Sequence, residues 1–200
     1  MSRDQKYKAI VIGASSGGME IISMLVRSLP ADFSLPILVV LHVADTSDGS
    51  WAGLLNDRVQ ITVKEADEKE QIREGTVYIA PANYHLLLEP DLTLTLTVDE
   101  RVNYARPAVD VLFETAAESC KDQLIGIVCT GGNSDGALGL RYIKKKGGVT
   151  IVQDPDTADV VSMPLSAIKA ADPDYILSPE EILDFLLTTH SNQRIYEFED

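Results

Sequence analysis

The chain has 200 residues, 45% of them hydrophobic and 24% charged, and a formal net charge of −14 at pH 7. This length and composition are typical of one globular domain with room for a complete hydrophobic core, and two domains would be cramped. The acidic charge works against binding to nucleic acid or to an anionic membrane, because the longest basic cluster covers only residues 144–146.

The sequence carries no sign of export, membrane insertion or zinc binding. Residues 1–8 are polar, no apolar stretch of signal-peptide length follows them, and the longest apolar runs are too short to span a bilayer. We therefore expect a cytoplasmic protein. Cys120 and Cys129 form no CxxC pair, which argues against a disulfide framework and against a zinc site. We expect both to be buried as small hydrophobic side chains.

Near-continuous apolar runs alternate with helical patterns along the chain, which is typical of a parallel sheet buried on both faces. The first half predicts a strand at 7–13, a helix at 19–29, a strand at 36–42, a short helix at 50–57, a strand at 61–66, a solvated connection at 67–75, and strand segments at 76–82, 85–89 and 91–97. The second half predicts helices at 106–120, 138–146, around 163–170 and at 179–190, with strands at 124–130, 148–154 and 175–178 between them.

The fold class that follows is α/β: a doubly wound, mostly parallel sheet with helices on both faces. The segments 76–82, 85–89 and 91–97 are separated by turn signals and look like a small antiparallel hairpin excursion attached to that sheet. Residues 1–190 are expected to form a single domain, and residues 191–200 a polar, frayed tail.

Residues 8–22 contain the turn around which the candidate site is organised. A short apolar run ends at Gly13 and an amphipathic pattern begins after Gly18, which predicts a strand, a tight glycine turn and a helix. A helix that begins there directs free N–H groups and the positive end of its dipole into one space, where a group gaining negative charge is stabilised. The turn could therefore cradle a nucleotide phosphate or present a serine nucleophile.

The phosphate interpretation rests on the segment GASSGG, which is close to the dinucleotide-binding turn of short-chain dehydrogenases. Tyr142 and Lys146 even supply a Tyr-x-x-x-Lys pair. However, Met19 stands where that fingerprint needs a glycine two residues beyond Gly17, and no acidic ribose-binding residue follows the second strand. Because Tyr142 lies inside an amphipathic helix directly before a lysine run, we interpret its spacing as chance.

The nucleophile interpretation rests on three polar residues at strand ends. Ser15 follows the first predicted strand, His42 ends the second, and Asp135 lies in the loop after the strand at 124–130. The carboxyl ends of parallel strands line one edge of a sheet, so these side chains could meet. Each also has a structural alternative: a helix cap for Ser15, a buried histidine bonded to backbone for His42, and a cap for the following helix for Asp135. The order Ser, His, Asp and the absence of a GxSxG elbow disfavour an α/β-hydrolase.

Several motifs in a fixed order make the chain resemble the protein-glutamate methylesterases of bacterial chemotaxis, the CheB catalytic domain. The segments are IGASSGG, VVLHV, VKEADEKEQIREGTVYIAP, RPAVDVLF and TGGNSDGALGL. The resemblance runs to about residue 180. It implies Ser15 as nucleophile, His42 as general base and Asp135 as the carboxylate that orients the histidine, which are the residues that the strand-end argument selects.

The activity implied by the resemblance is hydrolysis of glutamate γ-methyl esters on the cytoplasmic helices of chemoreceptors, and deamidation of glutamine by the same attack. Neither reaction needs a metal or another cofactor. We expect the oxyanion hole from backbone N–H groups near Ser16 and Gly17, and from Gly131 or Gly132. A catalytically inactive CheB-like binding module, or an esterase for a different carboxymethylated protein, are the alternatives.

The chain departs from the family pattern in the loop before the aspartate. Where the family has Met-Gly, this chain has Gly132 and Asn133, although the loop keeps its length and Asp135 should still reach the histidine. The family's N-terminal receiver domain is also missing from this sequence, so we expect any regulation to come from a separate chain. Arg106 matches the family's RP motif and could orient the substrate or form a structural ion pair. His85 also matches a family position, and we expect it to be structural.

Overall fold

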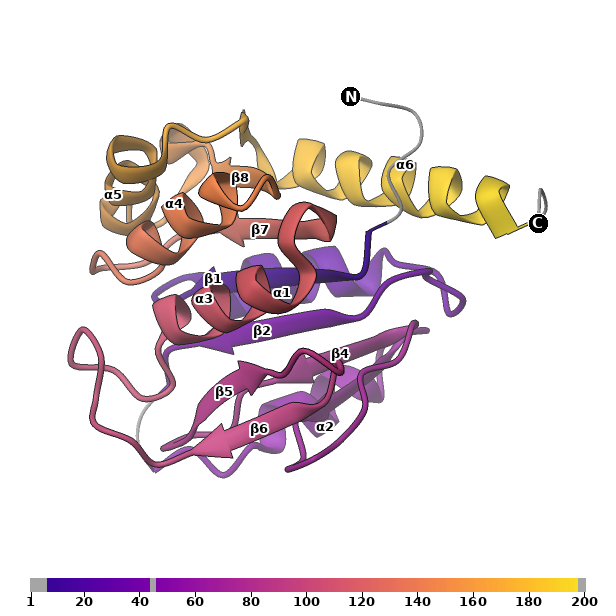
Figure 1. Ribbon diagram of the computed structural model, residues 1–200, viewed down its shortest axis with the longest axis horizontal. Coiled ribbons are helices and arrows are strands. Elements are labelled where there is room, and N and C mark those ends of the chain that lie inside the picture. Colours follow the sequence, from indigo (N-terminus) through magenta and orange to yellow (C-terminus); the bar gives the residue numbers. More distant parts are fainter. Residues whose placement is uncertain (1–6, 44–45, 198–200) are drawn as a thin grey trace.

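The computed structural model describes residues 7–43 and 46–197. Its centre is a parallel sheet whose strands follow the order β3-β4-β2-β1-β7-β8-β9 (Figure 1). The strands are β1 (Ala9–Ala14), β2 (Ile37–Leu41), β3 (Thr62–Glu65), β4 (Thr76–Ile79), β7 (Leu124–Val128), β8 (Val149–Gln153) and β9 (Tyr175–Leu177). The helices are α1 (Gly18–Arg27), α2 (Ser50–Asn56), α3 (Val109–Cys120), α4 (Ala137–Lys145), α5 (Ser162–Ala171) and α6 (Pro179–Glu197), with short 3₁₀ turns at Lys121–Gln123 and Pro155–Thr157.

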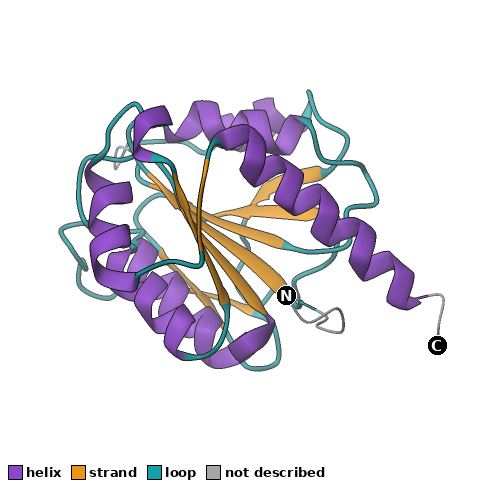
Figure 2. Ribbon diagram, turned by 90° about the horizontal axis from the view of Figure 1, so that it is seen from above, coloured by secondary structure: helices purple, strands orange, loops and turns teal. Residues whose placement is uncertain are grey.

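Helices cover both faces of the sheet, as Figure 2 shows. Side chains of a strand alternate between the faces, so the fully buried Ile10 and Ile12 of β1 join one core with α1, α2 and α6, whereas Val11 joins another with α3, α4 and α5. Burial on both sides explains why the strands are continuous apolar runs in the sequence. The predicted doubly wound α/β fold is confirmed.

The antiparallel part is smaller than the sequence indicated. β5 (His85–Leu88) and β6 (Leu94–Thr97) form a separate two-stranded antiparallel sheet. β4, which we expected to share that excursion, instead pairs in parallel with β2 and β3. Its four residues are all buried, as a strand inside the main sheet requires. The hairpin packs against α3 through Leu86 and Leu88.

The C-terminal helix extends further than predicted. α6 continues past His190 to Glu197, so residues 191–197 are helical and not frayed as expected, and residues 198–200 lie outside the described part of the chain. Gln193 explains part of this extension. Its buried side-chain amide accepts a hydrogen bond from Tyr7 N at 3.1 Å and donates one to Tyr7 O at 3.0 Å. A polar residue there satisfies backbone groups next to β1 rather than facing water.

No helix within the described residues is both long and apolar enough to cross a bilayer.

The order of the strands decides where a site can form. The chain leaves β1 toward β2, β4 and β3, and then returns to place β7 on the other side of β1. The loops that follow β1 and β7 therefore diverge at a topological switch point, where open α/β sheets bind their ligands.

Candidate active site

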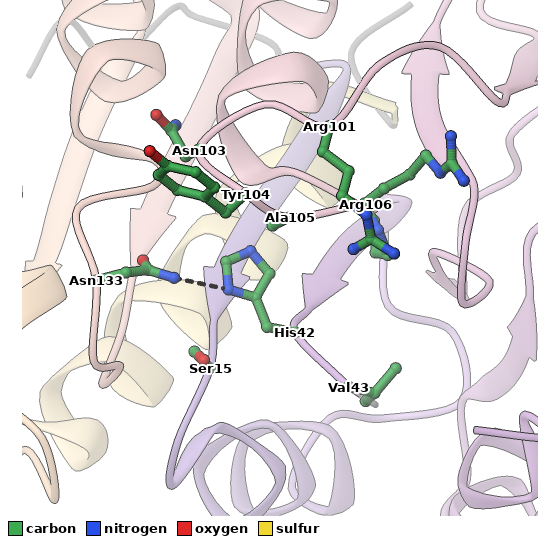
Figure 3. Close-up of a pocket in the computed structure, with 10 residues that line it drawn as sticks. Ser15, His42, Val43, Arg101, Asn103, Tyr104, Ala105, Arg106 and Asn133 are labelled. Carbon is green, nitrogen blue, oxygen red and sulfur yellow. Dashed lines mark hydrogen bonds between the residues drawn. The ribbon is translucent and has the colours of Figure 1, made fainter. Parts of the chain in front are cut away.

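Ser15, His42 and Asp135 come together at the switch point, each from the carboxyl end of a neighbouring strand. Ser15 directly follows β1, His42 directly follows β2, and Asp135 lies in the loop between β7 and α4. In Figure 3, Ser15 lies beside the ring of His42, and Asn133 approaches the same ring from the β7 loop. Residues far apart in the sequence are thus adjacent because their strands are adjacent.

The glycine turn holds Ser15 at the mouth of α1. Ser15 N donates to Thr130 O at 2.9 Å, which ties the turn to the end of β7, and Gly18 N donates to Ser15 O at 2.8 Å. The residue that caps α1 is Gly17, with φ 78° and no side-chain cap bond, so Ser15 is not a helix cap. A left-handed φ suits glycine, and it lets the chain reverse while the serine side chain stays in the pocket.

Asp135 is fully buried at the N-terminus of α3. Its Oδ2 accepts from Val109 N at 2.6 Å, and its Oδ1 accepts from Asp110 N at 3.1 Å. Burial raises the pKa of this carboxyl, but hydrogen bonds from His42, Asn103 and these backbone groups outweigh it, so the net pKa lies below the ordinary value. Asp135 is therefore ionised at neutral pH. It does not cap α4, because the N-cap residue of α4 is Gly136 and no side chain makes a cap hydrogen bond there.

His42 contacts two side chains through its two ring nitrogens. Nε2 lies 2.8 Å from Asp135 Oδ2, and Nδ1 lies 3.0 Å from Asn133 Nδ2. Because an ionised carboxylate only accepts hydrogen bonds, the ring proton is on Nε2 and Nδ1 is the basic nitrogen. Serine proteases present the ring the other way, with the carboxylate on Nδ1. The alternative of a histidine bonded only to backbone is excluded for His42.

Asn103 supports the carboxylate from a loop that the sequence did not single out. Its Nδ2 donates to Asp135 Oδ1 at 3.0 Å and to Asp110 Oδ2 at 2.8 Å. Burial raises the pKa of Asp110, and the charge of Asp135 adds to this effect against the opposing hydrogen bonds. Asn103 has φ 51° and Tyr104 has φ 64°. No local sequence signal marks Asn103, because its partners lie on α3 and in the β7 loop.

An open pocket of about 430 Å³ is lined by Ser15 and His42, whereas Asp135 is buried and does not line it. Its lining is Ser15, His42, Val43, Arg101, Asn103, Tyr104, Ala105, Arg106, Pro107 and Asn133. Tyr104 is 97% exposed at the rim. Arg106 Nη1 donates to the backbone oxygens of Val98 at 2.6 Å and Asp99 at 2.9 Å, and among the described residues it has no carboxylate partner, so the expected structural ion pair is not formed there.

His85 is structural, as predicted. It is buried, its Nδ1 accepts from Ala108 N at 3.2 Å, and its Nε2 lies 3.0 Å from Glu100 O. Ala108 precedes α3, so the ring fixes the segment that leads to Val109 and thereby to Asp135.

The backbone donors predicted for an oxyanion hole differ in availability. Gly131 N already donates to Val160 O at 3.0 Å, which removes it from the candidates. Within residues 7–43 and 46–197, the N–H groups of Ser16, Gly17 and Gly132 have no acceptor. The side chain of Met163, from α5, packs closely against Gly131. A Cβ added to Gly131 would lie 2.0 Å from Met163 Sδ, so only glycine fits at this position.

No group of three His, Cys, Asp or Glu side chains among the described residues is arranged to hold a metal ion. Cys120 and Cys129 are buried, as predicted, and burial raises the pKa of their thiols to about 11 and about 12. Neither is a thiolate nucleophile at neutral pH.

The chain is similar to known proteins over most of its length. A family profile described as CheB methylesterase matches residues 10–186. A putative protein-glutamate methylesterase/protein-glutamine glutaminase of Leptospira interrogans is 50% identical over 93% of this chain and 96% of its own length. A protein-glutamate methylesterase/protein-glutamine glutaminase of Thermotoga maritima is 36% identical over 90% of this chain, which spans 54% of that relative.

The crystal structure of the Thermotoga maritima CheB methylesterase catalytic domain has a TM-score of 0.87 to this chain at 36% identity, and the match covers 92% of this chain and 98% of that one. Sequence and fold therefore agree over the same region. The chain belongs to the CheB methylesterase family.

Proposed function

We propose that the chain hydrolyses glutamate γ-methyl esters on the cytoplasmic helices of methylated chemoreceptors, with Ser15 as nucleophile, His42 as general base and Asp135 as the carboxylate that orients it. Family membership makes the protein a carboxylic ester hydrolase. The observation that carries the assignment of residues is the 2.8 Å contact between His42 Nε2 and the buried Asp135, in the pocket that Ser15 lines.

The reaction would proceed in two half-reactions. His42 Nδ1 takes the Ser15 hydroxyl proton as Oγ attacks the ester carbonyl, and Asp135 stabilises the resulting imidazolium. The tetrahedral intermediate collapses, the C–O bond to the methoxy group breaks, and His42 gives its proton to the methoxy oxygen, so that methanol leaves. Water then attacks the acyl-enzyme with His42 again as base, which frees glutamate and regenerates Ser15.

The oxyanion of each tetrahedral intermediate would be held by the N–H groups of Ser16 and Gly17, which have no acceptor in the described part of the chain, with Gly132 as a further donor from the facing loop. The N-terminus of α1 adds the positive end of its dipole at the same place. One such donor is typically worth about 3 kcal/mol of transition-state stabilisation. The same attack on a glutamine amide, with ammonia leaving, would give the glutaminase activity included in the relatives' names.

The rim of the pocket suits an acidic protein substrate. Arg101 and Arg106 both line the pocket, although the whole chain carries a formal charge of −14. We propose that Arg106, held by the carbonyl groups of Val98 and Asp99, orients the substrate segment that carries the ester. Because chemoreceptor methylation sites face the cytoplasm, the enzyme would act there, with control by a separate regulator chain.

The test is methanol release from carboxymethylated chemoreceptor fragments, with another carboxymethylated protein as a parallel substrate. We expect the native chain to release methanol from the receptor fragments, and Ser15→Ala to reduce kcat by about 10⁴-fold or more. Ser134→Ala is the matched control, because Ser134 is an exposed neighbour in the β7 loop. Binding to the receptor without any release would favour an inactive module, and release from the second protein alone would reassign the substrate.

A further inference from the structure

The side chain of Asn133 contacts His42 but has no role in the proposed triad. It occupies the position where the family motif has glycine, and it lines the same pocket as Ser15 and His42. Figure 3 shows its amide directed at the ring of His42, with the contact of 3.0 Å drawn between them.

The hydrogen bonds on both ends of this amide fix its orientation. Asp135 N donates to Asn133 Oδ1 at 3.0 Å, so the oxygen must face that N–H and the NH₂ group must face His42. His42 Nδ1 therefore accepts, which agrees with the proton that Asp135 requires on Nε2. Asn133, His42 and Asp135 form a closed ring of three hydrogen bonds, each of which pairs one donor with one acceptor.

This closed set of hydrogen bonds leaves His42 no free nitrogen that could accept a hydrogen bond from the Ser15 hydroxyl. The basic nitrogen of a neutral imidazole has one lone pair, and Asn133 uses it. Ser15 Oγ has no hydrogen-bond partner among the residues described. We propose that Asn133 is a positioning residue that occupies the general-base nitrogen of His42 in the free enzyme and is displaced by the Ser15 hydroxyl when substrate enters. The inference rests on the proposed function only in taking Ser15 and His42 as nucleophile and base.

The surroundings of Asn133 give its side chain room to leave. It is partly exposed on the wall of an open pocket. The neighbouring Gly132 is loosely packed, since a Cβ there would make only ordinary van der Waals contacts, with Val160 Cγ1 at 3.9 Å and Ser16 Oγ at 4.0 Å. Turning the amide outward gives up its contacts with His42 and with Asp135 N. The Asn133 side chain is thus held by two hydrogen bonds, and the substrate must offset their loss.

The contact itself is tested by the ¹⁵N signal of His42 Nδ1 in the full chain, compared with Asn133→Ala and Ser15→Ala. We expect Asn133→Ala to move this signal toward the value of an unbonded acceptor nitrogen, and Ser15→Ala to leave it in place. A signal that moves only in Ser15→Ala would overturn the inference, because it would make the serine the resting partner of Nδ1.

The consequence is tested by the rate at which a small alkyl fluorophosphonate labels Ser15. In this reaction an Oγ–P bond forms, the P–F bond breaks, fluoride leaves and His42 takes the hydroxyl proton. We expect Asn133→Ala to react about fivefold faster than the native chain, because one competing hydrogen bond is gone. Asn133→Asp keeps an acceptor for Asp135 N but offers Nδ1 a carboxylate, which stabilises the protonated ring, so we expect labelling about tenfold slower. Ser134→Ala should label at the native rate.

A merely structural role for Asn133 predicts the opposite order, in which both variants are slower and Asn133→Ala is the slower of the two; that result refutes the inference. Neither readout uses a methyl ester. If the native chain releases no methanol but shows the expected pattern, the proposed substrate fails and this inference stands. If methanol is released and the pattern is reversed, this inference alone fails.

Discussion

Replacing Asp135 by asparagine tests the centre of the proposed site, because the two side chains have nearly the same shape and differ in one acceptor. Asp135 is fully buried and all of its partners are donors. On the Oδ1 side an NH₂ group would face three N–H donors. On the Oδ2 side it would face two further donors, His42 Nε2 and Val109 N, the latter 2.6 Å from Oδ2 in the native chain. The amide therefore has no orientation that satisfies its surroundings.

The less unfavourable orientation places NH₂ toward His42 and Val109. Val109 N–H then loses its acceptor, which costs about 1–3 kcal/mol, and the loss of the ionised acceptor adds to it, so we expect about 2–5 kcal/mol of destabilisation. The amide would donate to Nε2 and move the ring proton to Nδ1, the nitrogen that must act as base. We expect kcat for methanol release to fall by about 10⁴-fold.

Urea unfolding and steady-state methanol release of Asp135→Asn measure the two effects separately. Asp110→Asn is the matched control, because this buried carboxyl contacts Asn103 and Gly139 but not His42. We expect Asp110→Asn to keep kcat within about tenfold of the native value, because Asp110 affects the position of the His42 imidazole only indirectly, through Asn103 and Asp135. If Asp135→Asn retained activity within tenfold while folded, the assignment of Asp135 as the residue that sets the tautomer would be wrong.

Three further predictions concern stability. Because the pKa of Asp135 is lowered, its contribution to the unfolding free energy is fully present above the ordinary aspartate pKa of about 3.9 and is lost as pH falls through the lowered pKa. The difference in unfolding free energy between the native chain and Asp135→Asn should therefore narrow in that acid range. A difference that stays constant with pH would contradict this prediction. Gly17→Ala forces an alanine to φ 78° and should cost about 1–2 kcal/mol in urea unfolding, whereas unchanged stability would show that the turn relaxes. Gln193→Ala leaves Tyr7 N and O unpaired and should cost about 1–3 kcal/mol, with the exposed Asn192→Ala as control; equal stability of both variants would exclude a structural role for that amide.

Much of the fold could be predicted from local patterns. The first strand was expected at 7–13 and is β1 at Ala9–Ala14, because a strand buried on both faces must be apolar throughout. Parallel strands place their carboxyl ends at one edge, so the sequence indicated that Ser15, His42 and Asp135 could meet. The structure brings them together because β1 lies between β2 and β7. The extension of α6 and the pairing of β4 could not be predicted, since each depends on a distant partner, Tyr7 for the helix and β2 for the strand.

The sequence by itself determined the α/β class, the family resemblance and the residues that could form a triad, because burial periodicity and motif spacing are local properties of the chain. The tertiary structure decided which hydrogen bonds those residues make. It directed Asp135 to the start of α3, brought Asn103 to its second oxygen and set Asn133 against His42. A donor and its acceptor are chosen by distance in space and by orientation, and neither is encoded in the residues adjacent to them.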